Sequence, residues 1–234
     1  MYLICGVDGC PGGWVVITKD LESGEVTWRL YPTARELFFS RLELAVIAID
    51  IPIGLLEKGA RDCDQEARKC LGFGRASSVF TAPLRSLLSI ANYREACDAR
   101  FQIEGKQLSK QAWNIFPKIR QVDELLRQNP TLQTRVREVH PEVCFYELAG
   151  RNPMRHNKKT LAGIEERRQL LAPVFGSCLD AALAQRKALA SGTDDVLDAF
   201  AALWTAERIA LGQAYTLPAD PQADACRLRM EMVV

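Results

Sequence analysis

Residues 1–16 read MYLICGVDGCPGGWVV, and the expected fold is built outward from this stretch. An apolar run over residues 2–7 meets a carboxylate at Asp8, a glycine-rich segment follows over residues 9–13, and a second apolar run begins at Trp14. The pattern predicts a buried strand, a tight turn and a returning strand. A carboxylate at the end of a buried strand is costly unless it holds something positive, so Asp8 is a candidate ligand for a divalent metal. Alternatively, Asp8 is only a turn residue that accepts bonds from neighbouring N–H groups.

The composition is typical of a globular chain with a substantial core. The sequence has 234 residues, of which 48% are hydrophobic and 25% charged, and its formal net charge of +1 gives no general attraction to nucleic acid or membrane. The charge is unevenly distributed, because residues 58–137 carry 15 basic and 8 acidic side chains while both flanking regions are acidic. A basic middle region can contact phosphate, although a solvated charged face is the commoner explanation.

The eight cysteines indicate buried thiols more than a zinc site. No two of them form a C-x-x-C pair, and the chain has only two histidines. The apolar run over residues 44–56 is interrupted by Asp50 and Pro52 and is too short to span a bilayer. No charged-then-apolar leader opens the sequence. We therefore expect a cytoplasmic protein with mostly reduced thiols and no membrane contact.

The order of expected elements begins with three strands, a helix and a fourth strand. A third strand is expected at residues 26–30, a helix at 34–41 with Thr33 and Glu36 in a capping box, and a buried strand at 45–49 that ends in Asp50. Residues 55–129 are basic and helical in pattern, and 136–139 return to strand, with 143–146 extending that edge. Helices are expected at 160–171, at 179–190 and from Thr193 or Asp194 through Ile209.

These elements suggest a core with an insertion. We expect residues 1–54 and 136–217 to form the core, residues 55–135 a basic helical lobe inserted after the fourth strand, and residues 218–234 a polar tail with a short apolar end. A stretch as long as the insertion is not expected to be a loop.

The last expected helix carries acids at its start. Asp195 and Asp198 share a helix face, as do Asp194 and Asp198, and their repulsion would be relieved by a divalent cation. Asp194 and Asp195 are also ordinary cap residues. Asp198 is harder to explain in this way, because it lies within an almost entirely apolar segment, where an unpaired buried carboxylate is unfavourable.

Carboxylates from separate strands and one helix suit Mg²⁺ or Mn²⁺, which prefer oxygen ligands. Two such ions about 4 Å apart activate water and stabilise a leaving oxygen in phosphoryl transfer. The acids expected at this centre are Asp8, Asp50, Asp195 and Asp198, with Glu142 a weaker candidate. The residues expected to contact a phosphoester substrate are Arg61, Arg75, Ser77, Ser78, Lys110, Lys118 and His140. Ser77 and Ser78 can instead cap a helix, and His140 with Glu142 can form a simple turn.

Several of these segments resemble a known family. They are residues 6–14 (GVDGCPGGW), 48–54 (AIDIPIG), 75–80 (RASSVF), 116–119 (FPKI), 139–145 (VHPEVCF) and 194–199 (DDVLDA). Together they resemble domain-of-unknown-function family 429, whose members are predicted ribonuclease H-like nucleases, and the resemblance covers roughly residues 3–211.

The resemblance implies an α/β fold, a ribonuclease H-like mixed five-stranded sheet flanked by helices. It places Asp8 on the first strand and Asp50 on the fourth, where such nucleases hold metal. Asp195 and Asp198 look like the acidic pair on the last helix of Holliday-junction resolvases. Many relatives with this fold also use an acid on the first helix. Here that helix offers Glu36, which is better explained as a cap, so Glu142 is the candidate to fill the gap.

Three functions remain open from the sequence. The first is a metal-dependent nuclease or phosphodiesterase that cleaves nucleic acid, or another phosphoester, by a two-metal mechanism. The second is a phosphotransferase of the sugar-kinase and actin group, which shares the fold and a glycine-rich hairpin, although that group usually has two such domains and the P-loop pattern is missing here. The third is a non-catalytic binding protein that kept the fold. The oligomeric state is not indicated by any of these patterns.

Overall fold

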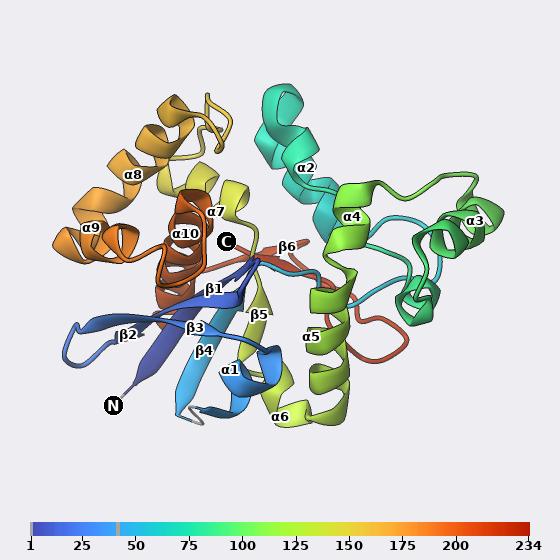
Figure 1. Ribbon diagram of the computed structural model, residues 1–234, viewed down its shortest axis with the longest axis horizontal. Helices are drawn as coiled ribbons and strands as arrows, with labels where there is room; N and C mark the ends of the chain where they lie inside the picture. The colour runs from blue at the N-terminus through green and yellow to red at the C-terminus, as the bar shows by residue number, and fades with distance from the viewer. Residues whose placement is uncertain (1, 41–42) are drawn as a thin grey trace.

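The computed structural model describes residues 2–40 and 43–234, and a five-stranded mixed sheet lies at its centre (Figure 1). The strand order is β3-β2-β1-β4-β5. The pairs β1–β2 and β2–β3 are antiparallel, whereas β1–β4 and β4–β5 are parallel. The expected fold class, a mixed five-stranded α/β sheet flanked by helices, is confirmed. The strands are β1 (Leu3–Cys10), β2 (Gly13–Asp20), β3 (Val26–Tyr31), β4 (Leu44–Ile49) and β5 (Val136–Glu138).

The helices lie between β3 and β4 and, in larger number, after β4. The helix expected at 34–41 is observed at Ala34–Ser40, with residues 41 and 42 outside the described residues. Thr33 caps this helix as expected, because the Glu36 amide donates to Thr33 Oγ1 at 3.2 Å, and the Glu36 carboxylate accepts from the Thr33 hydroxyl at 3.0 Å. The helices are α1 (Ala34–Ser40), α2 (Asp62–Arg75), η1 (Ala76–Ser78), η2 (Arg85–Ser89), α3 (Tyr93–Glu104), α4 (Lys110–Asn114), α5 (Phe116–Gln128), α6 (Pro130–Gln133), α7 (Pro141–Leu148), α8 (Leu161–Phe175), α9 (Ser177–Ala184) and α10 (Thr193–Ala210).

One expected element is wrong. Residues 143–146 do not extend the sheet edge but lie inside α7. Pro141 occupies the first helical position, where its missing N–H leaves no intrahelical bond unmade. The Val143 and Cys144 amides donate to the carbonyl of His140, which starts the helix.

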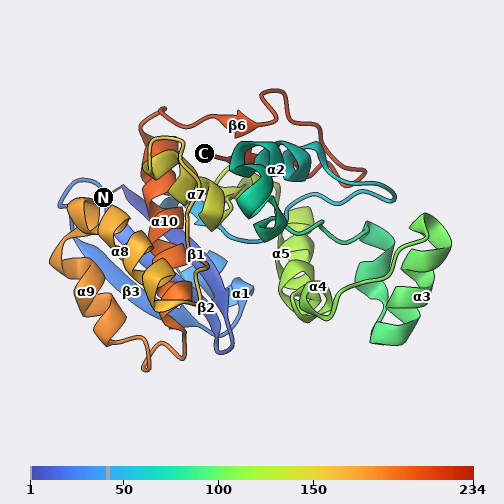
Figure 2. The ribbon, with the colours of Figure 1, turned by 90° about the horizontal axis from the view of Figure 1, so that it is seen from above.

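The two faces of the sheet have separate cores. Along β1, Cys5 and Val7 pack with α1 and α5, whereas Ile4 packs with α10 on the other face. This alternation follows the two-residue period of a strand. Figure 2 shows α10 on one side of the sheet and α1 on the other.

The segment between β4 and β5 forms the helical part that stands beside the sheet, and α3 lies at its far end in both views (Figures 1 and 2). The chain then returns through α5 and α6 to β5, which pairs with β4.

The C-terminal residues form a small second sheet, β6 (Thr216–Leu217) with β7 (Met232–Val233). Met230, Met232 and Val234 are buried against Cys63 and Leu71 of α2. The tail therefore contributes apolar core beneath the helical insertion. Within the described chain, no helix combines the length and apolar character needed to cross a bilayer. The cysteines at positions 10, 63, 70, 97, 144, 178 and 226 are free thiols.

Candidate functional site

Asp8 and Asp50 are neighbours because of the register of two parallel strands. Val7 of β1 pairs with Ile49 of β4 as the last pair of these two strands, so the next residues, Asp8 and Asp50, lie side by side where β4 ends and β1 continues to Cys10. The Asp50 amide also donates to the Val7 carbonyl at 3.0 Å. By strand alternation both aspartates belong to the face covered by α10, since Ile4 and Ala48 lie on that face.

Helix α10 brings Asp198 to the same face. It packs so closely on β1 that a Cβ on Gly6 would lie 2.2 Å from the Ala199 carbonyl oxygen and 2.0 Å from the Leu203 amide nitrogen. Glycine is required at this position because two backbones meet there. The close approach places the residue before Ala199, which is Asp198, over the end of β1.

Asp198 is fully buried, and only one of its two carboxylate oxygens has a partner among the described residues. Its Oδ2 accepts from Lys158 Nζ at 2.5 Å, and its Oδ1 is buried without a hydrogen-bond partner among the described residues. Lys158 lies on the connection between α7 and α8, and its side chain is 36% exposed. A bare buried carboxylate oxygen is unusual, and a cation is the chemical partner that suits it.

The charges of these groups act on one another. Burial raises the pKa of Asp8 well above its usual value, and the charges of Asp50 and Asp198 raise it further. Burial likewise raises the pKa of Asp198 to about 6, against the opposing effect of Lys158. Although burial alone would lower the pKa of Lys158, the carboxylates of Asp198, Asp8 and Asp50 raise it. The three aspartates therefore form one electrostatic group.

A cleft of about 360 Å³ opens beside this acidic group. Asp50 lies in its wall together with Lys158 and Lys159. The facing residues come from the end of α2, from η1 and from the start of α7. Among the residues expected to contact substrate, those in the cleft wall are Arg75, Ser77, Ser78 and His140.

Glu142 lies in the same wall but is already engaged. Its Oε2 accepts from Arg75 at 2.7 Å, and its Oε1 accepts from the fully buried Arg167. Burial opposes ionisation, but the guanidinium groups of Arg167 and Arg75 hold the pKa of Glu142 below its usual value. In this arrangement Glu142 orders Arg75 and links α2 to α8. His140 Nε2 lies 3.3 Å from the Ser78 carbonyl oxygen.

Asp195 caps the helix, and its charge also acts on Asp8. Its Oδ2 accepts from the Gly192 amide at 2.8 Å, which satisfies the N-cap amide at the start of α10. Asp194 beside it pairs with Lys159 at 2.5 Å. Burial raises the pKa of Asp195, while the bond from Gly192 opposes the rise. The cap interpretation of these two acids therefore fits their contacts.

Three residues expected to contact substrate are not in the cleft wall. Arg61 is buried and binds Asp64 and Glu138, so it is not free to meet a phosphate. Lys110 lies over the Tyr93 ring at 3.8 Å. Lys118 donates to the Gly13 carbonyl at 2.6 Å and lies over the Trp14 ring.

Other residues of the protein fill the space beside the glycine-rich hairpin. A Cβ on Gly9 would lie 2.8 Å from Cδ of Lys118, and a Cβ on Gly13 would lie 2.2 Å from the Tyr31 carbonyl oxygen. Gly13 also has a φ of 138°, which disfavours other residues. These glycines allow close internal packing, because a Cβ at either position would clash with the Lys118 side chain or the Tyr31 carbonyl.

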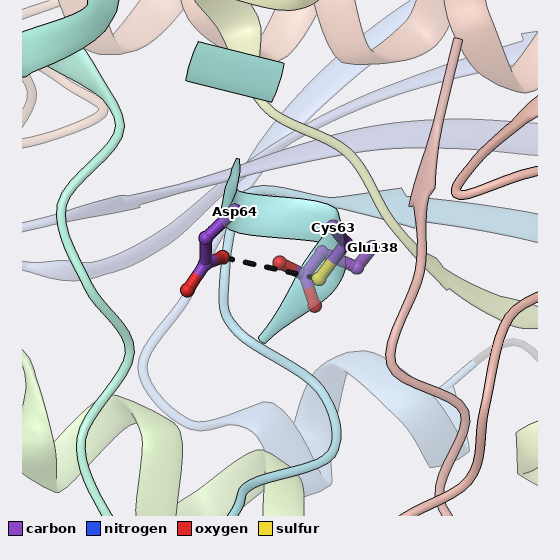
Figure 3. A group of neighbouring side chains, drawn as sticks. All are labelled: Cys63, Asp64 and Glu138. Carbon is purple, nitrogen blue, oxygen red and sulfur yellow. Dashed lines mark hydrogen bonds between the residues drawn. The ribbon is translucent and has the colours of Figure 1, made fainter. Parts of the chain in front are cut away.

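A second buried group has ligand atoms close enough for a metal ion. One atom each of Cys63, Asp64 and Glu138 lies within 4.8 Å of the others (Figure 3). However, Arg61 contacts both carboxylates, at 2.5 Å to Asp64 and 2.7 Å to Glu138. The remaining oxygens accept from the Ile53 and Ala82 amides. One guanidinium thus faces two carboxylates, so hydrogen bonds and ion pairs join β5 to α2 here while the negative charge of the group is only partly balanced.

The comparisons with known proteins agree with the family resemblance. Residues 6–223 match the family described as "Protein of unknown function (DUF429)". The chain belongs to the DUF429 family. Searches of curated proteins and of solved structures give no significant match.

Several cleft residues of this DUF429 chain were not anticipated from its sequence. Lys158, Lys159 and Asn157 come from an irregular connection with no periodic pattern. Gln111 reaches the cleft from α4. The pairs Lys158–Asp198 and Arg167–Glu142 join residues 40 and 25 positions apart. From the sequence, only the acids of these pairs, Asp198 and Glu142, could be singled out, because each lies in an apolar segment and therefore needs a positive partner.

Proposed function

We propose that this protein is a divalent-metal-dependent hydrolase of phosphodiester bonds, with nucleic acid as the substrate. Asp8, Asp50 and Asp198 would hold Mg²⁺ or Mn²⁺. The observation that carries the proposal is the electrostatic interaction of these three acids beside the last paired residues of β1 and β4, with Asp198 Oδ1 buried and unbonded among the described residues. Hard oxygen ligands of this kind match the preference of both ions.

The donor set also suits a phosphoester in the cleft. Arg75 presents a guanidinium that Glu142 holds in place, and guanidinium groups bind phosphate oxygens in a bidentate manner. The hydroxyls of Ser77 and Ser78 are further donors beside it. A bound divalent ion would supply an activated water and would neutralise charge on the phosphate. The protein's own contribution is to orient the phosphate between these donors and the three acids.

The test uses substitutions that remove charge but keep shape. We expect Asp8→Asn and Asp198→Asn each to lower Mn²⁺-dependent cleavage by at least about a hundredfold, because ligands that stabilise transition-state charge contribute several kcal/mol. Asp180→Asn, an exposed position on α9, is the matched control. Substrates are single-stranded and duplex DNA, RNA, a branched junction and a small phosphodiester, with circular dichroism to verify folding.

Two results would refute the assignment. One is equal cleavage by wild type and by either site variant. The other is calorimetry in which wild type takes up no Mn²⁺, or in which Asp198→Asn takes it up as tightly as wild type does.

A further inference from the structure

Lys158 occupies the position in which a metal-binding role for Asp198 would place an ion. Its ammonium lies 2.5 Å from Asp198 Oδ2 and interacts electrostatically with Asp8 and Asp50. A singly charged group thus meets three carboxylates, and Asp198 Oδ1 has no hydrogen-bond partner among the described residues. The ammonium therefore neutralises this group only in part.

The acids and Lys158 together do not form a ready metal site. Among the described residues, Asp8, Asp50 and Asp198 do not share the 4.8 Å spacing that Cys63, Asp64 and Glu138 have. A divalent ion on Asp198 would also face the Lys158 ammonium at close range, where like charges repel strongly in a buried setting. Binding of a metal ion at Oδ1 and of the ammonium at Oδ2 of Asp198 therefore oppose each other.

The side chain of Lys158 can move while its backbone stays fixed. Asn157 Oδ1 accepts from the Lys159 amide at 2.9 Å, and the Asn157 carbonyl accepts from the Thr160 hydroxyl at 2.8 Å. Gly163 of α8 packs directly on the Asn157 carbonyl. The segment is thus anchored to the start of α8. The lysine stem is long and flexible, and it already lines the cleft.

We propose that Lys158 is a built-in cation that exchanges with a divalent metal ion at Asp198. The metal takes the carboxylate, and the displaced ammonium swings into the cleft, where it binds a substrate phosphate beside Arg75. This inference rests on the proposed function. It makes Lys158 a positioning residue for the acids before the metal binds and a phosphate-binding residue afterwards.

The first test compares two adjacent lysines by Mn²⁺ calorimetry on the full chain. Lys158→Met removes the competing charge, so we expect Mn²⁺ to bind at least about tenfold more tightly than to wild type. Lys159→Met is the matched control, because Lys159 pairs with Asp194 and not with Asp198, and its side chain is 71% exposed. We expect that variant to stay within about threefold of wild type. Equal or weaker binding by Lys158→Met overturns the exchange.

The second test uses the wild-type chain, so it does not depend on folding of a variant. Amine acetylation is followed by mass spectrometry with and without saturating Mn²⁺. If the ion displaces Lys158, its acetylation rate rises several-fold, while that of Lys159 stays constant. A Lys158 rate that falls or does not change while Mn²⁺ binds overturns the proposal.

The outcomes also separate this inference from the proposed function. Tight Mn²⁺ binding to both wild type and Lys158→Met, without a difference, leaves the metal-dependent hydrolase intact and rejects only the exchange. Failure of Mn²⁺ to bind either protein rejects both.

Discussion

Asp198 gives the protein a stability that depends on pH. Its pKa in the folded chain is about 6, above its usual value, chiefly because it is buried. The folded state therefore holds the proton more tightly than the unfolded state does, and the stabilisation present below about pH 4 is lost as pH rises to about 6. Asp8 shifts in the same direction. We expect urea unfolding, without added metal, to show the free energy of wild type falling relative to Asp198→Asn over this range.

The control for this prediction is Asp180→Asn, whose carboxylate pairs with Arg168 on the exposed surface. Burial also raises the pKa of Glu138, to about 7. Because Glu138 is present in every variant, its contribution cancels in the difference between their free energies of unfolding. A difference between wild type and Asp198→Asn that does not change from pH 4 to pH 7 would contradict the prediction.

At the scale of single residues, the acids could be found from the sequence and their partners could not. Asp8 and Asp50 end apolar runs, and Asp198 interrupts one, so each stands out as a charge in a buried setting. Lys158 is a lysine in a polar connection, like many exposed lysines. Only the folded chain shows that it reaches Asp198, 40 positions away. Arg61 illustrates the converse, since a basic residue in a basic segment is buried against Glu138.

At the scale of elements, the contact between α10 and β1 sets the geometry of the site. Gly6→Ala would place a methyl group against the backbone of Ala199 and Leu203. Because backbone cannot rotate away as a side chain can, we expect a loss of more than about 2 kcal/mol in the free energy of unfolding. The helix would also move off the strand, so Mn²⁺ binding at Asp198 should weaken. Urea unfolding and calorimetry measure the two effects.

Gly74→Ala provides the matched substitution. Gly74 lies in α2 with open space around its Cβ position. Alanine favours helix over glycine by about 0.5–1 kcal/mol, so this variant should be as stable as wild type or more so. If Gly6→Ala behaves like Gly74→Ala, the close packing of α10 on β1 does not constrain the site.

Element type was predicted best where the apolar period was clear. The strands at 26–30 and 45–49 are observed within one residue at each end, because alternation and flanking turns define them. The short segment 143–146 is apolar in the sequence and fits either a strand or a buried helix turn. The bonds from Val143 and Cys144 to His140 decide for the helix, and they depend on the turn that Pro141 begins.

At the scale of the whole molecule, buried ion pairs join the helical insertion to the sheet. Arg61 contacts Asp64 on α2 and Glu138 on β5, and it donates to the Ile53 carbonyl at 2.9 Å. Arg61→Met would leave two buried carboxylates unpaired, which costs about 3–5 kcal/mol. Arg168→Met removes an exposed pair and should cost less than about 1 kcal/mol. Chemical denaturation distinguishes them, and equal losses would contradict a special role for Arg61.

The role of the C-terminal tail is the feature of the molecule that is least predictable from the sequence. Its polar composition predicts a solvated end, yet Asp224 is buried. Its Oδ2 accepts from the Leu55 amide at 2.8 Å and from Arg85, and its Oδ1 accepts from the Cys226 and Leu228 amides. One carboxylate thus fastens the tail to the start of the insertion, a contact across 169 positions.

Asp224→Ala therefore tests whether the tail holds the insertion in place. The substitution leaves the Leu55 amide and part of the Arg85 guanidinium without an acceptor, so we expect a loss of about 3 kcal/mol in the free energy of unfolding. Amide hydrogen exchange should also accelerate at Leu55 and Leu228. Asp220→Ala, an exposed acid in the same tail, should leave both measurements unchanged. If both variants behave alike, the tail lies on the insertion without stabilising it, since the residue that links them would then contribute nothing.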